Sequence, residues 1–158
     1  MTPPKDPSNP IFQVDYLQHP VSDEHLREVL SRVAQALQTN LEVTSGDRDQ
    51  ALAVGGGIRS LHLKHRAADF HQPPLTDGAV FQRIQDLASS IFASSEAYEL
   101  IHHGPFTETT GPHVHLGHYP QDAHPPGVYC KIEGLTAADR GKYTVIRVVH
   151  VDAAGQAS

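Results

Sequence analysis

The sequence has a single cysteine, Cys130, and no long hydrophobic run. One cysteine excludes an internal disulfide framework, so the cysteine content favours neither an oxidising nor a reducing compartment. No stretch of the chain is apolar over the length that a membrane-spanning helix needs. The first residues, 1–7, contain no hydrophobic segment. We therefore expect neither a secretory signal nor a membrane span.

The chain also lacks an excess of positive charge. Its 12 Lys and Arg residues are outnumbered by 18 Asp and Glu residues, which gives a formal net charge of −6. Nucleic-acid-binding proteins usually carry a basic patch, so we expect no nucleic-acid partner. With 158 residues, 39% of them hydrophobic, the chain is long enough for one globular domain with a real core, which we expect to be a monomer.

Histidine, in contrast, is abundant, with 12 residues gathered mainly in two regions. The first region contains His62, in a segment that continues to Asp69, and the second contains His113 and His115. Residues two apart in a strand point to the same face, so the imidazoles of His113 and His115 would face one way. A carboxylate between apolar residues, such as Asp69, is costly to bury unless it pairs or binds a metal.

These residues suggest a metal site. Two imidazoles and one carboxylate, from His62, His115 and Asp69, suit a catalytic zinc ion, which takes three protein ligands and leaves a fourth position for water. Two other interpretations remain open from the residues alone. Asp69 could cap a turn while His62 lies on the surface, and His113 and His115 could form the exposed polar face of an edge strand.

The hydrophobic pattern predicts an α+β fold with an antiparallel sheet flanked by helices. One helix is predicted from about Asp23 to Gln38 with Ser22 as its N-cap, and another from Thr76 or Asp77 to about Ile91. Strands are predicted at residues 41–44, 66–70, 98–102, 113–119, 128–132 and 143–151, the last two as an antiparallel hairpin. We divide the chain into an N-terminal arm (1–20), a core (21–120) and a C-terminal β extension of the same domain (121–158).

A run of three glycines, Gly55-Gly56-Gly57, precedes the His62 segment. Such a run could suggest a phosphate-binding loop, but no Lys-Ser or Lys-Thr pair follows it, so a P-loop is not expected. The glycines would instead let the backbone turn tightly before His62.

The order of these motifs resembles the M15 family of zinc peptidases. This family includes D-alanyl-D-alanine carboxypeptidases, dipeptidases and phage endolysins, and it shares the Hedgehog/DD-peptidase fold. The resemblance runs from about Leu41 to Tyr119, half of the chain, and only the ordered combination of motifs is specific. The matching segments are Ser45-Gly46-Asp47-Arg48, Gly55-Gly56, Ser60-x-His62-x4-Ala67-x-Asp69, and His115 in a later strand.

The resemblance implies one zinc ion per chain, bound by His62, Asp69 and His115. It also implies that Arg48 and Ser60 contact the substrate. A guanidinium suits that role because it offers fixed, paired donors to a carboxylate or carbonyl. The other interpretation of Arg48 is a salt bridge with Asp47 or Asp49.

Two positions depart from the family pattern. A glycine after the first zinc histidine is replaced by His65, whose bulk could crowd the site or add a polar group to it. The acidic general base that often stands three residues before the last zinc histidine is replaced by Pro112, which cannot act as a base. Three residues could take its place: Glu108 on the preceding loop, His113, or His103. We favour His113, because its strand holds it on the same face as the last zinc ligand.

The resemblance therefore implies a zinc metallopeptidase, a hydrolase of the D,D- or L,D-carboxypeptidase or endopeptidase type. It would cleave a peptidoglycan-derived peptide near a D-amino acid by metal-activated water, at the cell wall or in the periplasm. Because the acid at position 112 is missing, a non-catalytic, zinc-stabilised domain that binds a peptide or protein remains the alternative. A His-rich metal buffer, the third interpretation, predicts several weakly bound metals per chain.

Overall fold

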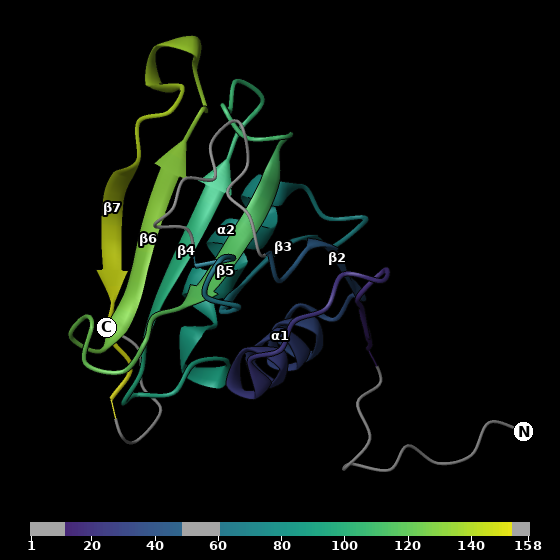
Figure 1. The fold of residues 1–158 in the computed structure, drawn as a ribbon, viewed down its shortest axis with the longest axis vertical. Coiled ribbons are helices and arrows are strands. Elements are labelled where there is room, and N and C mark those ends of the chain that lie inside the picture. The colour runs from purple at the N-terminus through teal and green to yellow at the C-terminus, as the bar shows by residue number, and fades with distance from the viewer. Residues whose placement is uncertain (1–11, 49–60, 153–158) are drawn as a thin grey trace, which may run out of the picture.

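The computed structural model of this chain describes residues 12–48 and 61–152. The predicted substrate-binding residue Ser60, the three glycines at 55–57 and Asp49 lie outside these residues. Within them, seven strands form one sheet in the order β1-β2-β3-β5-β4-β6-β7 (Figure 1). The strands are β1 (Val14–Asp15), β2 (Leu41–Ser45), β3 (Ala67–His71), β4 (Ala97–His103), β5 (His113–His118), β6 (Gly127–Glu133) and β7 (Thr144–Val149). The helices are α1 (Glu24–Leu37) and α2 (Asp77–Asp86), with short 3-10 helices at Ala88–Ser90 and Ala137–Asp139.

The α+β class is confirmed, but the sheet is mixed, and the prediction of an antiparallel sheet was wrong. The pairs β1–β2 and β4–β6 are parallel. The other neighbouring strands, including the predicted pair β6–β7, are antiparallel. The reason lies in the path of the chain after β5. It crosses to the free side of β4, so that β6 starts at the same end of the sheet as β4 and runs in the same direction.

Helix α1 begins one residue later than predicted, because Asp23 and not Ser22 is its N-cap. The Asp23 carboxylate accepts hydrogen bonds from the backbone N–H groups of His25 and Leu26, which have no partner within the helix. Ser22 cannot take this role, since its backbone N–H and its hydroxyl both bind the Asp47 carboxylate. The second helix, α2, is capped by Thr76, one of the two predicted caps.

The two helices cover one face of the sheet. The predicted apolar stripe of α1 is buried, and it shares one core with apolar side chains of α2, β3, β4, β5 and β6. On β5 the residues that enter this core are Val114 and Leu116. In Figure 1, α2 lies behind β4 and β5. No helix in the described part of the chain is long and apolar enough to cross a membrane.

The opposite face of the sheet carries the polar residues that the sequence singled out. Side chains alternate along a strand, so His113 and His115 point away from the core that holds Val114. The register then sets their neighbours: His115 lies opposite Asp69 of β3, and His113 lies opposite His103 of β4. This pairing gathers residues that are far apart in the sequence on the face opposite α1 and α2.

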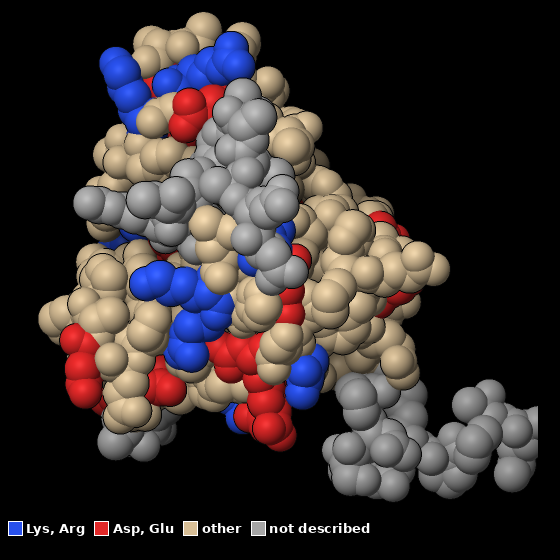
Figure 2. All heavy atoms as spheres, viewed as in Figure 1, with Lys and Arg blue, Asp and Glu red and all other residues tan. Residues whose placement is uncertain are grey.

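Charges of both signs are interspersed on the face drawn in Figure 2, outside the grey atoms. Lys and Arg side chains lie beside Asp and Glu side chains near the centre and the lower edge of this view. The described surface in this view therefore carries charges of both signs and no large patch of one sign.

Gly46, just after β2, occupies a position where a side chain does not fit. A Cβ atom added there would lie 2.2 Å from the carbonyl oxygen of Pro20, a backbone atom that cannot move aside cheaply. We predict that Gly46→Ala lowers the free energy of unfolding by about 1–3 kcal/mol, as overpacking does. The melting temperature, measured by circular dichroism, should then fall by roughly 2–12 °C.

Gly111→Ala is the matched control, because a Cβ atom at Gly111 meets no atom within 4 Å. Equal melting temperatures for the two variants would contradict this account of Gly46.

Candidate metal centre

The structure brings the three predicted zinc ligands together in a buried cluster. His62 lies in the turn before β3, Asp69 in β3 and His115 in β5. One ligand atom from each of these side chains lies within 4.8 Å of the other two. The exposed fractions of His62, Asp69 and His115 are 2%, 5% and 6%. The sequence interpretation that placed His62 on the surface is therefore wrong.

A single carboxylate oxygen, Oδ1 of Asp69, is the centre of this cluster. It lies 3.0 Å from Nε2 of His62, 2.9 Å from Nδ1 of His115 and 3.3 Å from Nε2 of His113. The second oxygen, Oδ2, lies 3.4 Å from Nη2 of Arg48. Burial alone would raise the pKa of Asp69, but its contacts with the three imidazoles hold that pKa well below its usual value. Asp69 is therefore an ionised, buried carboxylate.

The outer nitrogens of both ligand histidines are held by acceptors. Nδ1 of His62 lies 2.7 Å from the carbonyl oxygen of Gly46, and Nε2 of His115 lies 2.7 Å from Oε1 of Glu99. A carbonyl or an ionised carboxylate only accepts hydrogen bonds, so each of these outer nitrogens carries a hydrogen. In the neutral imidazoles, the inner nitrogens Nε2 of His62 and Nδ1 of His115 then present lone pairs to the same oxygen of Asp69.

Two lone pairs and an ionised oxygen facing one another need a positive charge between them. Burial lowers the pKa of His62, which favours its neutral form. Burial also acts to lower the pKa of His115, but Glu99 and Asp69 outweigh it and raise that pKa to about 9. When no metal is bound, a proton on Nδ1 of His115 supplies this charge. A divalent cation in its place would satisfy both inner nitrogens and Asp69 at once. Two imidazoles and one carboxylate, with the outer nitrogens held by a carbonyl and a carboxylate, fit zinc in both its direct ligands and their supporting contacts.

Glu99 of β4, which holds the candidate ligand His115, was missed by the sequence analysis. Burial would raise its pKa, but His115 and Lys131 lower it to about 2, so the carboxylate is ionised. Its other oxygen, Oε2, accepts hydrogen bonds from Nζ of Lys131 at 3.2 Å and from the hydroxyl of Tyr119 at 3.0 Å. The sequence offered one signal for Glu99. It is an acidic residue inside a predicted strand, and it shares a strand face with Ile101 and His103, which follow it by two and four positions.

His113, the favoured base, lies at the edge of the cluster. Its Nδ1 lies 2.6 Å from the carbonyl oxygen of Gly111, so Nδ1 carries a hydrogen and the lone pair of the neutral ring is on Nε2. Nε2 is the atom that faces Asp69. The strand that holds His115 therefore also presents a basic nitrogen to the same buried space.

The other two base candidates differ in their surroundings. The Glu108 carboxylate lies against Gly141, where an added Cβ atom would be 2.7 Å from its Oε2. His103 lies beside His113, with ring centroids 4.5 Å apart, and its Nδ1 is 2.6 Å from the carboxylate of fully buried Glu133. Burial and the neighbouring His113 lower the pKa of His103 to about 4. Glu133, which holds His103 in place, was not predicted, because its partner lies on another strand.

Local contacts hold the side chain of Arg48, and the backbone of His65 has an unusual conformation. The Arg48 side chain donates from Nε to Ser45 Oγ at 3.2 Å and pairs with Asp69, so the interpretation as a partner of Asp47 does not hold. His65 has a left-handed backbone, with φ at 58°. Glycine adopts this conformation most readily, so a glycine would fit at this position. The His65 ring lies toward Asp47, at 4.0 Å.

Comparison of this chain with protein-family models, with curated proteins and with solved structures gave no match. The family resemblance, the metal and the activity therefore stay predictions that rest on the motifs and on the geometry of the cluster.

Glu99 provides a test of the metal centre, because it touches a ligand and not the ion. We predict that Glu99→Gln weakens zinc binding at the His115 site about ten- to a hundredfold, since the amide keeps an acceptor but loses the charge that strengthens the imidazole. Competition with a coloured chelator measures this affinity. Glu42→Gln, which removes an exposed carboxylate on β2, is the control. Equal affinities for the two variants would remove Glu99 from the metal centre.

Proposed function

We propose that this protein is a zinc-dependent peptidase that cleaves a peptidoglycan-type peptide near a D-amino acid. The observation that carries the proposal is the convergence of His62 and His115 on one oxygen of Asp69, with the outer nitrogens of both rings already held by acceptors. The order of motifs that resembles the M15 peptidases supports the same activity. The substrate would be met at the cell wall or in the periplasm, where peptidoglycan lies.

The residues of the cluster divide into three tasks. His62, Asp69 and His115 would hold the zinc ion. When bound there, zinc supplies Lewis-acid chemistry, which polarises a carbonyl group and makes a water molecule more acidic. Glu99 and the Gly46 carbonyl keep both imidazoles in the orientation and tautomer that present a lone pair inward.

Arg48 would orient the substrate. Its guanidinium is anchored at Nε by Ser45 and lies against Asp69, so a positive charge is fixed at the edge of the cluster. The side chain is 16% exposed, which leaves part of it accessible from outside. A planar guanidinium can donate two parallel hydrogen bonds to a terminal carboxylate, as the carboxyl end of a peptide would require.

His113 would move the proton. Its Nε2 faces the cluster as a lone pair, while its Nδ1–H is bound to the Gly111 carbonyl. That atom can take a proton from the attacking water and return it to the leaving amine, which is the task of a general base that later acts as an acid. Glu108, whose carboxylate lies against Gly141, is the less favoured base.

One observation favours a second candidate, a non-catalytic domain in which zinc stabilises a peptide- or protein-binding fold. Nε2 of His113 lies only 3.3 Å from the oxygen of Asp69 on which the other imidazoles converge. His113 could therefore serve as a fourth protein ligand. A zinc ion with four protein ligands has no position for water and is structural.

Variants at His113 and Glu108 separate these functions. For the peptidase, we predict that His113→Asn lowers the turnover of muropeptides about a hundredfold or more while the zinc content is retained. Glu108→Gln should stay within a few-fold of the unmodified protein. Mass spectrometry of the digested muropeptides and elemental analysis measure the two quantities.

Each alternative has its own result in this experiment. If His113 is instead a structural ligand, His113→Asn should lose affinity for zinc and melt at a lower temperature, and the unmodified protein should have no turnover that a chelator abolishes. An inactive Glu108→Gln beside an active His113→Asn would assign the base to the loop carboxylate. Two active variants would leave His103 as the base to test.

Arg48→Lys tests the orienting role. Lysine keeps the positive charge but loses the paired donors, so we predict a loss of about tenfold or more in kcat/KM, the scale of one charge-assisted hydrogen bond. Zinc content and melting temperature should change little. Arg83→Lys, an exposed position on α2, is the control. Unchanged kinetics for Arg48→Lys would limit Arg48 to its ion pair with Asp69.

A further inference from the structure

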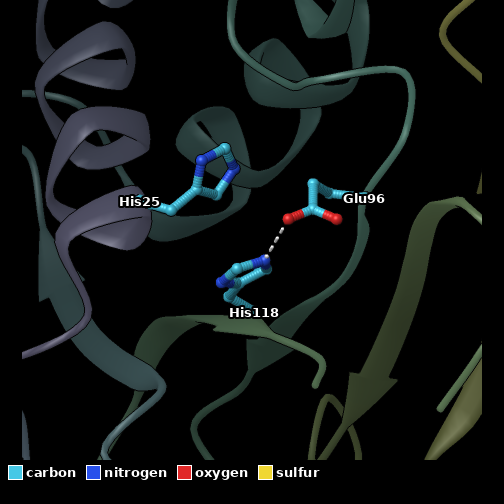
Figure 3. Close-up of side chains that lie close together, drawn as sticks. All are labelled: His25, Glu96 and His118. Carbon is cyan, nitrogen blue, oxygen red and sulfur yellow. Dashed lines mark hydrogen bonds and ion pairs between the residues drawn. The ribbon is translucent and has the colours of Figure 1, made fainter. Parts of the chain in front are cut away.

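A second group of metal-ligating side chains lies on the helix side of the sheet. His25 comes from the first turn of α1, Glu96 stands just before β4, and His118 is the last residue of β5 (Figure 3). One ligand atom from each lies within 4.8 Å of the other two. His118 belongs to the face opposite His115, so the strand β5 separates this group from the first cluster.

His118 is oriented in the same way as the ligand histidines of the first cluster. Its Nδ1 lies 2.6 Å from Oδ2 of Asp23, and its Nε2 lies 3.1 Å from Oε1 of Glu96. Both neighbours are carboxylates, which only accept hydrogen bonds, so either ring nitrogen can carry the hydrogen when no ion is bound. An ion bound at Nε2 would place the hydrogen on Nδ1, where the Asp23 carboxylate accepts it. Asp23 is also the N-cap of α1, so one side chain positions both His118 and the turn that carries His25.

Arg66 also contacts this group. Its Nη2 lies 3.0 Å from Nδ1 and 3.4 Å from Nε2 of His118, and its Nη1 lies 3.9 Å from the Asp23 carboxylate. The Arg66 guanidinium therefore lies beside both the His118 ring and the carboxylate that holds Nδ1.

His25 completes the group from the helix. Its ring lies 4.6 Å from that of His118, centroid to centroid, and in Figure 3 it points toward Glu96 and His118. Nε2 of His25 lies 2.6 Å from the hydroxyl of Tyr98, which also accepts a hydrogen bond from the backbone of Ala93. A metal bound at this nitrogen would replace the hydrogen bond from Tyr98, because an imidazole nitrogen has one lone pair.

We propose that His25, Glu96 and His118 form a second metal site, which takes a divalent cation of the zinc type and ties the start of α1 to the sheet. Two imidazoles and one carboxylate favour zinc, nickel or cobalt over calcium or magnesium, which prefer oxygen ligands. The Glu96 side chain is 30% exposed, so an ion can reach the group from the surface. The proposed role is structural, because the ion would hold the start of a helix against the ends of two strands.

Calorimetric titration of the metal-free, full-length protein with Zn²⁺ tests this site. We expect two equivalents for the unmodified protein and one for His115→Ala, which keeps the second site. Glu96→Gln and His25→Gln should each also bind one equivalent, at the first site. These two variants are independent, so a folding defect in one leaves the other as a test. His124→Gln, an exposed histidine outside both groups, should keep two equivalents.

Thermal unfolding supplies the second measurement, made in the His115→Ala background. Zinc at a hundred times its dissociation constant should lower the unfolding equilibrium constant about a hundredfold. Adding Glu96→Gln in the same background should abolish this effect. The proposal is overturned if the protein binds a single equivalent that His115→Ala removes, or if the second equivalent survives both Glu96→Gln and His25→Gln. Either result would identify the group as an imidazole held between two carboxylates by hydrogen bonds alone.

Discussion

The ionised carboxylate of Asp69 is the constraint on which the candidate site depends. A buried charge is costly unless surrounding groups compensate it. Three imidazoles and a guanidinium surround this one, and the compensating positive charge comes from Arg48 and from His115, whose pKa is raised to about 9. Each of these groups belongs to a different segment or position: the turn before β3, the loop after β2, and two positions of β5. The burial of one oxygen therefore ties together parts of the chain that share no local structure.

The pairing of β3 with β5 makes that arrangement possible. Asp69 lies directly opposite His115, and a shift of the register by one residue would turn one of them toward the helices. The apolar side of β5, with Val114 and Leu116 in the core, holds this register in place. The core on one face of the sheet thus determines which polar groups meet on the other.

The strand β5 also connects the two groups of potential metal ligands. His113 and His115 point away from the helices, whereas His118 points toward α1. In both groups an imidazole is oriented by a carboxylate on its outer nitrogen: Glu99 holds His115, and Asp23 holds His118. The same device, a carboxylate on one ring nitrogen, is repeated on the two sides of one strand and leaves the other nitrogen facing the proposed ion.

The sequence by itself determined the elements with strong periodicity and the set of candidate ligands. The stripe of α1 and the alternation of His113, Val114 and His115 are local patterns. In each, the spacing of apolar residues a few positions apart indicates which face of the element is buried. Tertiary structure alone decided the parallel pairing of β4 with β6, the choice of Asp23 as the N-cap, and the partners Glu99 and Glu133. These depend on which strands and loops meet across the sheet. No local pattern encodes such long-range contacts, and the meeting of His25, Glu96 and His118 is of the same kind.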